Sequence, residues 1–364
     1  MNTQEINQMA EEVHNQNHSG SKMSNLVFNK ETGEFNQVPA DQPVGTGEIV
    51  TQMTDKGFAA GADPLFNLRL GFLYSRNNGI LEVDILNDMR VMIVGLGSFG
   101  SQIALELAKA GVGSFALFDF DKVEVHNLAR HIALFRDLGR LKIDVVGEYI
   151  KGKNPYATVD KFEVDVNDNI ELLNTEIAKA NLVICTTDNN RSRFLISEAL
   201  ASNGKTGIFG RAYTRAEGGD VFVQRRGGAC YGCLLGRGFK VDEEITNKAS
   251  GRSNGAIPAY VSEDDADAVV QVGLSSDIEP ICNMMTKLSL VELSRGKHSG
   301  IESLEGELTY NYYIWANRRE KHFANWPAMN NSAGGPTVLR WYGSNISRID
   351  GCAVCAEGEI KLEE

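Results

Sequence analysis

The stretch from Arg90 to Ala108 joins a strand, a glycine loop and a helix, and it constrains the fold more than any other part of the chain. Residues 90–94 form an apolar run of strand length, and apolar residues at helical density begin at Ile103. Between them lies G-L-G-S-F-G, with glycines at Gly95, Gly97 and Gly100. Such a loop lets the backbone approach a phosphate at the N-terminus of the helix. The stretch therefore predicts a βα unit that binds a nucleotide.

Strands and helical segments continue to alternate as far as residue 209. Strands are predicted at 115–118, 158–164, 182–185 and 207–209, and helices at 142–151, 170–180 and 191–201. This alternation is typical of a mostly parallel sheet with helices on both faces.

The order of elements changes after Asp220. Segments 221–224, 310–315 and 338–342 read as strands compatible with antiparallel pairing, and 278–293 is apolar on nearly every side, which indicates a buried helix. We therefore expect an α/β fold, with a doubly wound, mostly parallel Rossmann-like sheet that is continued by antiparallel strands.

The ends of the chain differ from this pattern. Residues 1–61 are rich in Asn, Gln, Glu and Ser and show no sustained period, so we expect a flexible tail there; the alternative is an arm that folds along a partner or a second subunit. Residues 62–89 are expected to form a helical lead-in to a main domain at 90–364. That domain contains a crossover at about 234–273 and an insertion at about 299–349, whose tryptophans belong either to the core or to a docking surface: Trp315, Trp326 and Trp341.

Charge and hydropathy exclude some classes of partner. The 48 acidic and 36 basic residues give a formal charge of −12, which repels nucleic-acid phosphates and anionic lipids. No apolar run approaches the roughly 20 residues that span a bilayer, and the start of the chain lacks the layout of a signal peptide. We expect a cytoplasmic protein with no nucleic-acid or membrane partner.

Polar residues after the glycine loop narrow the chemistry. Asp119 follows the next strand at the distance expected of a ribose-binding carboxylate, but this feature also fits an NAD or FAD enzyme. Asn127, Arg130 and Lys142 are not needed for hydride transfer, whereas nucleotidyl transfer needs donors and cations where charge builds on the phosphates. Asp188, after the strand 182–185, offers a carboxylate for Mg²⁺.

Five motifs resemble, in order and spacing, those of the ThiF/MoeB/HesA superfamily. They are G-L-G-S-F-G at 95–100, D-F-D at 119–121, N-L-A-R at 127–130, G-R-L-K at 139–142 and T-D-N at 187–189. The resemblance covers residues 90–233 closely, and the helix near Leu288 and the last C-x-x-C more loosely. It implies an adenylation domain in which a substrate carboxylate attacks the α-phosphate of ATP, giving an acyl-adenylate and pyrophosphate.

The same resemblance implies roles for individual residues. Gly97 and Asp119 would bind the nucleotide and ribose, while Asp188 would hold Mg²⁺. Phosphate binding would fall to Asn127, Arg130 and Lys142, and the motifs add Asp121 and Asn189 to the nucleotide site. Three of these residues have simpler alternative explanations: Asp119 as a strand-end turn, Lys142 as a solvated helix residue and Asn189 as a helix cap.

The segment Tyr74-Ser75-Arg76 resembles the N-terminal segment of this superfamily, whose arginine reaches the ATP of the neighbouring subunit in a homodimer. Arg76 is therefore expected to act in trans, although its distance from the glycine loop is shorter than in the family pattern. The alternative is a surface arginine.

Four of the six cysteines form two C-x-x-C pairs, Cys230 with Cys233 and Cys352 with Cys355. Two such pairs present four thiolates, which suits a structural Zn²⁺, and the superfamily often carries them. Free thiols or a redox pair are the alternative.

The other two cysteines are poor nucleophiles by position. Cys185 lies in an apolar strand and Cys282 in an apolar helix, where small buried thiols are common. The crossover segment 240–272 contains no cysteine. We expect the enzyme to stop at the adenylate and pass it to a thiol, sulfide or amine of another protein.

By the resemblance, the substrate is the C-terminal carboxylate of a small ubiquitin-like or sulfur-carrier protein ending in Gly-Gly, with a conjugating enzyme or sulfurtransferase downstream. The alternatives are adenylation of a short peptide, as in microcin-type biosynthesis, and a nucleotide-binding scaffold or NAD-dependent enzyme.

Overall fold

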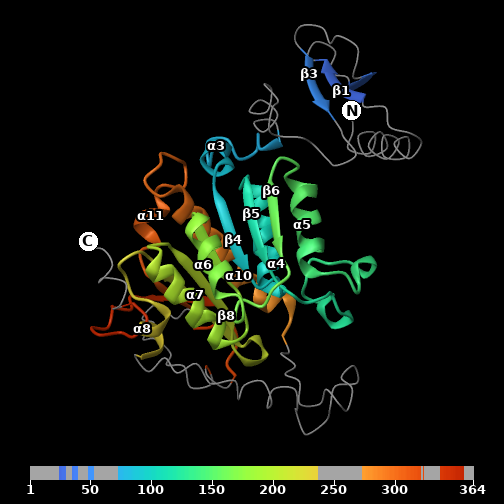
Figure 1. The fold of residues 1–364 in the computed structure, drawn as a ribbon. Helices are drawn as coiled ribbons and strands as arrows, with labels where there is room; N and C mark the ends of the chain where they lie inside the picture. The colour runs from blue at the N-terminus through green and yellow to red at the C-terminus, as the bar shows by residue number, and fades with distance from the viewer. Residues whose placement is uncertain are drawn as a thin grey trace. The chain divides into compact units, whose positions relative to one another are not determined.

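The computed structural model describes residues 73–236, 273–320, 323 and 337–355, together with the backbone of three strands nearer the N-terminus (Figure 1). The chain divides into two units, residues 1–78 and 79–364. In the first unit, β1 (Ser24–Asn29), β2 (Phe35–Pro39) and β3 (Glu48–Gln52) form an antiparallel sheet in the order β2-β1-β3. These strands lie within the range 1–61, for which the sequence suggested no regular structure. The rest of that range lies outside the described residues, and its flexibility stays a prediction.

The second unit is built on an eight-stranded sheet in the order β11-β10-β9-β8-β7-β4-β5-β6. Its five parallel strands are β4 (Arg90–Val94), β5 (Ser114–Phe118), β6 (Thr158–Phe162), β7 (Leu182–Cys185) and β8 (Gly207–Ala212). Three antiparallel strands extend it: β9 (Gly218–Gln224), β10 (Tyr312–Ala316) and β11 (Arg340–Ser344). The predicted parallel core with an antiparallel continuation is confirmed.

Helices cover both faces of this sheet because its inner strands are apolar on both sides (Figure 1). Val91 and Ile93 of β4 pack in one apolar cluster with α4 (Ser98–Ala110), α5 (Lys142–Lys153) and α10 (Ser275–Ser294). Met92 and Val94 point the other way and pack with α6 (Ile170–Lys179), α7 (Asn190–Ser202) and α8 (Tyr231–Gly236). Two short helices, α3 (Val83–Asn87) and α11 (Leu304–Glu307), also pack against the first cluster, through Leu86 and Leu304.

The helix α10 is the buried helix that the sequence predicted at 278–293. Two glycines allow it to lie against the sheet, since a Cβ at Gly210 would be 2.1 Å from the Met285 sulfur and one at Gly219 would be 2.3 Å from Ile281 Cδ1. None of the described helices is long and apolar enough to span a bilayer.

The tryptophans of the expected insertion belong to the packed sheet where they are described. Trp315 of β10 is buried, and its ring centroid lies 5.4 Å from that of Trp341 in β11. Trp326 and the crossover segment 240–272 lie outside the described residues.

Candidate nucleotide and metal sites

The glycine loop joins β4 to α4, and its backbone geometry requires glycine at two of its three glycine positions, Gly95 and Gly100. Gly95 has φ +87°, which favours glycine. A Cβ at Gly100 would be 1.9 Å from the Gly95 carbonyl oxygen, so this position admits no side chain without a shift of the loop. A Cβ at Gly97, the N-cap of α4, would meet nothing within 4 Å. The loop is thus tightly packed inside and open at the N-terminus of α4, where an anion is favoured.

We predict that Gly100→Ala destabilises the protein by about 1–3 kcal/mol, because the new methyl group has to displace the Gly95 backbone. Gly152→Ala in α5 is the matched control, since a Cβ there would meet nothing within 4 Å and helical alanine is favoured over glycine by about 0.5–1 kcal/mol. Chemical denaturation of both variants measures the difference. Equal stabilities would show that the loop adapts freely.

Asp119 ties the end of β5 to the glycine loop. Its Oδ2 accepts the Leu96 N–H at 2.6 Å, and its Oδ1 accepts the Asp121 N–H at 2.8 Å. Burial raises the pKa of Asp119, although Lys142 and the two N–H donors act in the opposite direction. The residue therefore forms a strand-end turn, and its binding of ribose stays a prediction.

Lys142 is brought to the same place from the start of α5. Its Nζ lies 2.7 Å from Asp121 Oδ2, and its backbone N–H donates to the Asp121 carbonyl at 2.9 Å. The residue is only 8% exposed, so it is not a solvated helix residue.

Asn127 and Arg130 lie in the segment between β5 and α5, and Asn127 ends the 3-10 turn Val125–Asn127 within this segment. The Asn127 Oδ1 accepts the Glu124 N–H at 2.9 Å, and its carbonyl accepts the Arg130 N–H at 2.9 Å. Gln102 of α4 donates its Nε2–H to the Arg130 carbonyl at 3.1 Å. The segment is therefore fastened to the helix that starts at the glycine loop.

The loop after β7 completes this edge of the sheet. Thr186 donates its hydroxyl to the Gly95 carbonyl at 2.6 Å, which joins the loop after β7 to the loop after β4. The Asn189 Oδ1 accepts the Ser192 N–H at 2.9 Å, so Asn189 is a helix cap for α7, the simpler of the two explanations of this residue. Asp188 is exposed between them.

Arg76 lies in the first unit, exposed in the turn that follows Leu73. Its action across a dimer interface stays a prediction.

His131, which the sequence analysis did not single out, lies against the glycine loop. It is buried, its Nε2 lies 2.8 Å from the Leu96 carbonyl oxygen, and its Nδ1 accepts the Ala133 N–H at 2.9 Å. The one feature of the sequence that could have indicated this residue is its position directly after Arg130, at the end of the N-L-A-R motif.

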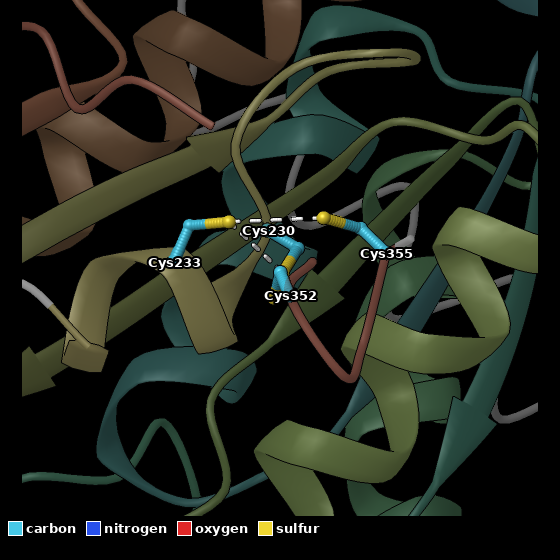
Figure 2. Close-up of side chains that lie close together, drawn as sticks. All are labelled: Cys230, Cys233, Cys352 and Cys355. Atoms are coloured by element: carbon cyan, nitrogen blue, oxygen red, sulfur yellow. Dashed lines mark hydrogen bonds between the residues drawn. The ribbon is translucent and has the colours of Figure 1, made fainter. Parts of the chain in front are cut away.

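The four cysteines of the two C-x-x-C pairs converge, although 122 residues separate Cys230 from Cys352 (Figure 2). Their sulfur atoms all lie within 4.8 Å of one another. The Cys230 sulfur lies 3.6 Å from that of Cys233 and 3.5 Å from that of Cys352, and the sulfurs of Cys233 and Cys355 are 3.7 Å apart. Tetrahedral zinc with Zn–S bonds of about 2.3 Å needs sulfur atoms about 3.8 Å apart. The cluster therefore fits Zn²⁺, and its separations are too long for disulfides.

The surroundings of the cluster act differently on its thiols, since burial raises the pKa of Cys230 and of Cys355, whereas the pKa of Cys352 is lowered. The backbone N–H of Ile349 donates to the Cys233 sulfur at 3.3 Å, as expected of a group that supports a metal ligand. Burial opposes ionisation of Cys352, but the backbone N–H groups of Val354 and Cys355 bring its pKa down to about 7. At Gly232 a Cβ would lie 2.8 Å from the Val354 side chain, so this glycine lets the two pairs approach each other.

The remaining two cysteines are buried, as predicted. Burial raises the pKa of Cys185, and it raises the pKa of Cys282 to about 12. Both thiols are therefore protonated at neutral pH and unsuited to nucleophilic attack.

Comparison with known proteins gives a consistent result. The model of the ThiF family matches residues 75–313. The adenylyltransferase and sulfurtransferase MOCS3 of Culex quinquefasciatus is 28% identical over 210 residues, which are 56% of this chain and 47% of that protein. The adenylyltransferase and sulfurtransferase uba4 of Emericella nidulans is 34% identical over 160 residues, which are 41% of this chain and 32% of that protein. The chain thus spans about half the length of these relatives or less.

Solved structures share the fold. Escherichia coli MccB with ATP superposes with a TM-score of 0.51 at 16% identity, covering 75% of this chain and 68% of that one. The same protein with succinimide gives a TM-score of 0.54 at 17% identity, covering 78% and 74%.

Proposed function

Because this chain belongs to the ThiF family, we propose that it is an ATP-dependent adenylyltransferase that activates the C-terminal carboxylate of a small protein. The observation that carries the proposal is the meeting of three loops at the carboxyl ends of β4, β5 and β7. Parallel sheets bind ligands at this edge, where the strand order reverses. The glycine loop offers backbone N–H groups at the start of α4, and Lys142 offers a cation. The loop after β7 offers the carboxylate of Asp188.

In the proposed reaction a carboxylate oxygen attacks the α-phosphorus of ATP. A bond forms between that oxygen and phosphorus, the bond from the α-phosphorus to the bridging oxygen breaks, and pyrophosphate leaves. Lys142 and Arg130 would stabilise the charge that builds on the phosphate oxygens, with Asn127 as a further donor. Asp188 would hold Mg²⁺, which when bound neutralises the leaving pyrophosphate.

The substrate we propose is a ubiquitin-like or sulfur-carrier protein ending in Gly-Gly. The names of the curated relatives, which combine adenylyltransferase with sulfurtransferase, support a sulfur carrier. Four of the six cysteines form the cluster that fits a metal ion, and the other two are buried thiols, so none is suited to accept the acyl group. A downstream conjugating enzyme or sulfurtransferase would therefore take the adenylate. We further propose a homodimer in which Arg76 reaches the partner's nucleotide.

A short peptide is the second candidate substrate. The observation that favours it is the extent of the likeness to the microcin C7 biosynthetic enzyme MccB in complex with N-formylated MccA, which covers 75% of this chain.

The test is ATP–pyrophosphate exchange by the purified chain. We expect labelled pyrophosphate to enter ATP only when a carrier with an intact C-terminal Gly-Gly is present, and not with the same carrier lacking these two residues. If a short peptide supports exchange and none of the carriers does, the second candidate is selected.

Exchange with neither kind of substrate would leave a nucleotide-binding scaffold or an NAD-dependent enzyme. A covalent adduct between chain and carrier that reductant cleaves would contradict the proposal that the reaction stops at the adenylate.

A further inference from the structure

His131 connects the two segments that the proposed phosphate site requires. Its side chain contacts the glycine loop through Leu96, and its backbone N–H donates to the Asn127 carbonyl at 2.8 Å. We propose that His131 is a positioning residue for ATP, which holds the Leu96 carbonyl and thereby aims the Gly97 N–H at the phosphates. This inference rests on the proposed function, because it assumes that a nucleotide occupies the glycine loop.

The geometry of the peptide group gives the physical reason. The Leu96 carbonyl and the Gly97 N–H belong to one planar trans peptide, so they point in opposite directions. The carbonyl points to the buried imidazole, and the N–H therefore points away from it. Gly97 is the N-cap of α4, where backbone N–H groups have no intrahelical partner, and the space around its missing Cβ is open. The N–H is thus presented to a ligand.

The preceding peptide of the loop is held separately. The Thr186 hydroxyl donates to the Gly95 carbonyl at 2.6 Å, and Asp119 accepts the Leu96 N–H at 2.6 Å. These contacts fix the peptide between Gly95 and Leu96, whereas His131 contacts the next one. Each of these two peptide groups of the loop is therefore held by different side chains.

The hydrogen bonds of the imidazole define its tautomer. The Ala133 N–H donates to Nδ1 at 2.9 Å, so Nδ1 is an acceptor and the neutral ring carries its proton on Nε2. Nε2 then donates to the Leu96 carbonyl at 2.8 Å. Burial lowers the pKa of His131 to about 4, and the charge of Lys142 acts in the same direction. The ring is neutral at pH 7, as this arrangement needs.

Kinetics of ATP–pyrophosphate exchange test the role. His131→Leu removes the donor and should raise the KM for ATP about tenfold with less than about a twofold change in kcat, because the interaction is made before and during the reaction. His131→Gln keeps an N–H donor and should restore KM to within about threefold of the wild type. His126→Leu is the control, since His126 lies in the same segment with a side chain 47% exposed, and it should leave both constants unchanged.

An unchanged KM in His131→Leu, or equal effects of the Leu and Gln changes, would overturn the role. Nitrogen NMR of the wild-type imidazole provides a readout that needs neither activity nor a variant. We expect a neutral ring with its proton on Nε2 at pH 7, and a proton on Nδ1 or a charged ring would also overturn it. If none of the tested substrates supports ATP–pyrophosphate exchange by the wild type, the proposed function fails. The NMR result still decides the hydrogen bonding of His131.

Discussion

Replacing Lys142 with alanine is expected to lower the rate of ATP–pyrophosphate exchange by about 10²–10³-fold, the range seen when one preorganised charge-stabilising group is removed from a transition state. Lys142 is a buried cation, and two contacts with Asp121 hold it in place. Its Nζ lies 2.7 Å from the Asp121 carboxylate, and its backbone N–H donates to the Asp121 carbonyl. A fixed cation stabilises developing charge without having to reorganise during the reaction.

The matched control for this change is Lys122→Ala. Lys122 is exposed and lies beside Leu141 through an isolated bridge, so it belongs to the same pair of segments as Lys142 without being buried. We expect the control to exchange at the wild-type rate. Because the side chain of Asp121 is 53% exposed, water solvates its carboxylate after the change at Lys142, and the melting temperature should fall little. Exchange within about threefold of the wild type in Lys142→Ala would exclude the proposed role.

The second large effect is expected at the cysteine cluster. The wild-type protein should contain one equivalent of zinc, and Cys233→Ser should lose it and lower the melting temperature by on the order of 10 °C, because structural zinc contributes folding free energy directly. Cys233 is fully buried and lies within 3.7 Å of two other cluster sulfurs. Removing its thiolate leaves three sulfur ligands, whereas a closed structural zinc site needs four.

Cys282→Ala provides the control for this experiment. Cys282 is buried in α10 and lies outside the cluster, so this variant should keep its zinc. Its free energy of unfolding should fall only by the small amount that packing of one buried sulfur atom contributes. Elemental analysis and thermal melting, with and without a chelator, measure both effects. Less than half an equivalent of zinc in the wild-type protein would favour free thiols or a redox pair.

Local sequence was enough to predict the strands of the large sheet and its long helices, but not the short helices α8 and α11. The apolar run at 182–185 and the helix near 278–293 are strong signals because a continuous apolar stretch can be recognised from neighbouring residues alone. Gly100 was likewise recognised from its local motif, whereas Asn189 was assigned to the nucleotide site with a helix cap as the alternative, and the structure shows the cap on Ser192. The strands between residues 24 and 52 were not predicted because each contains only two or three apolar residues, and the surrounding stretch is rich in Asn, Gln and Glu.

Taken alone, the sequence determined the α/β class, the glycine loop and the presence of two C-x-x-C pairs, since each is a pattern within a few residues. The tertiary structure decided which distant groups meet. Lys142 reaches Asp121 across 21 residues and His131 reaches Leu96 across 35, and both contacts depend on how the segment after β5 folds back. The cysteine pairs meet because β9, β10 and β11 pair in one sheet, with one pair after β9 and the other after β11. Strand order and register set these distances, and neither can be read from local periodicity.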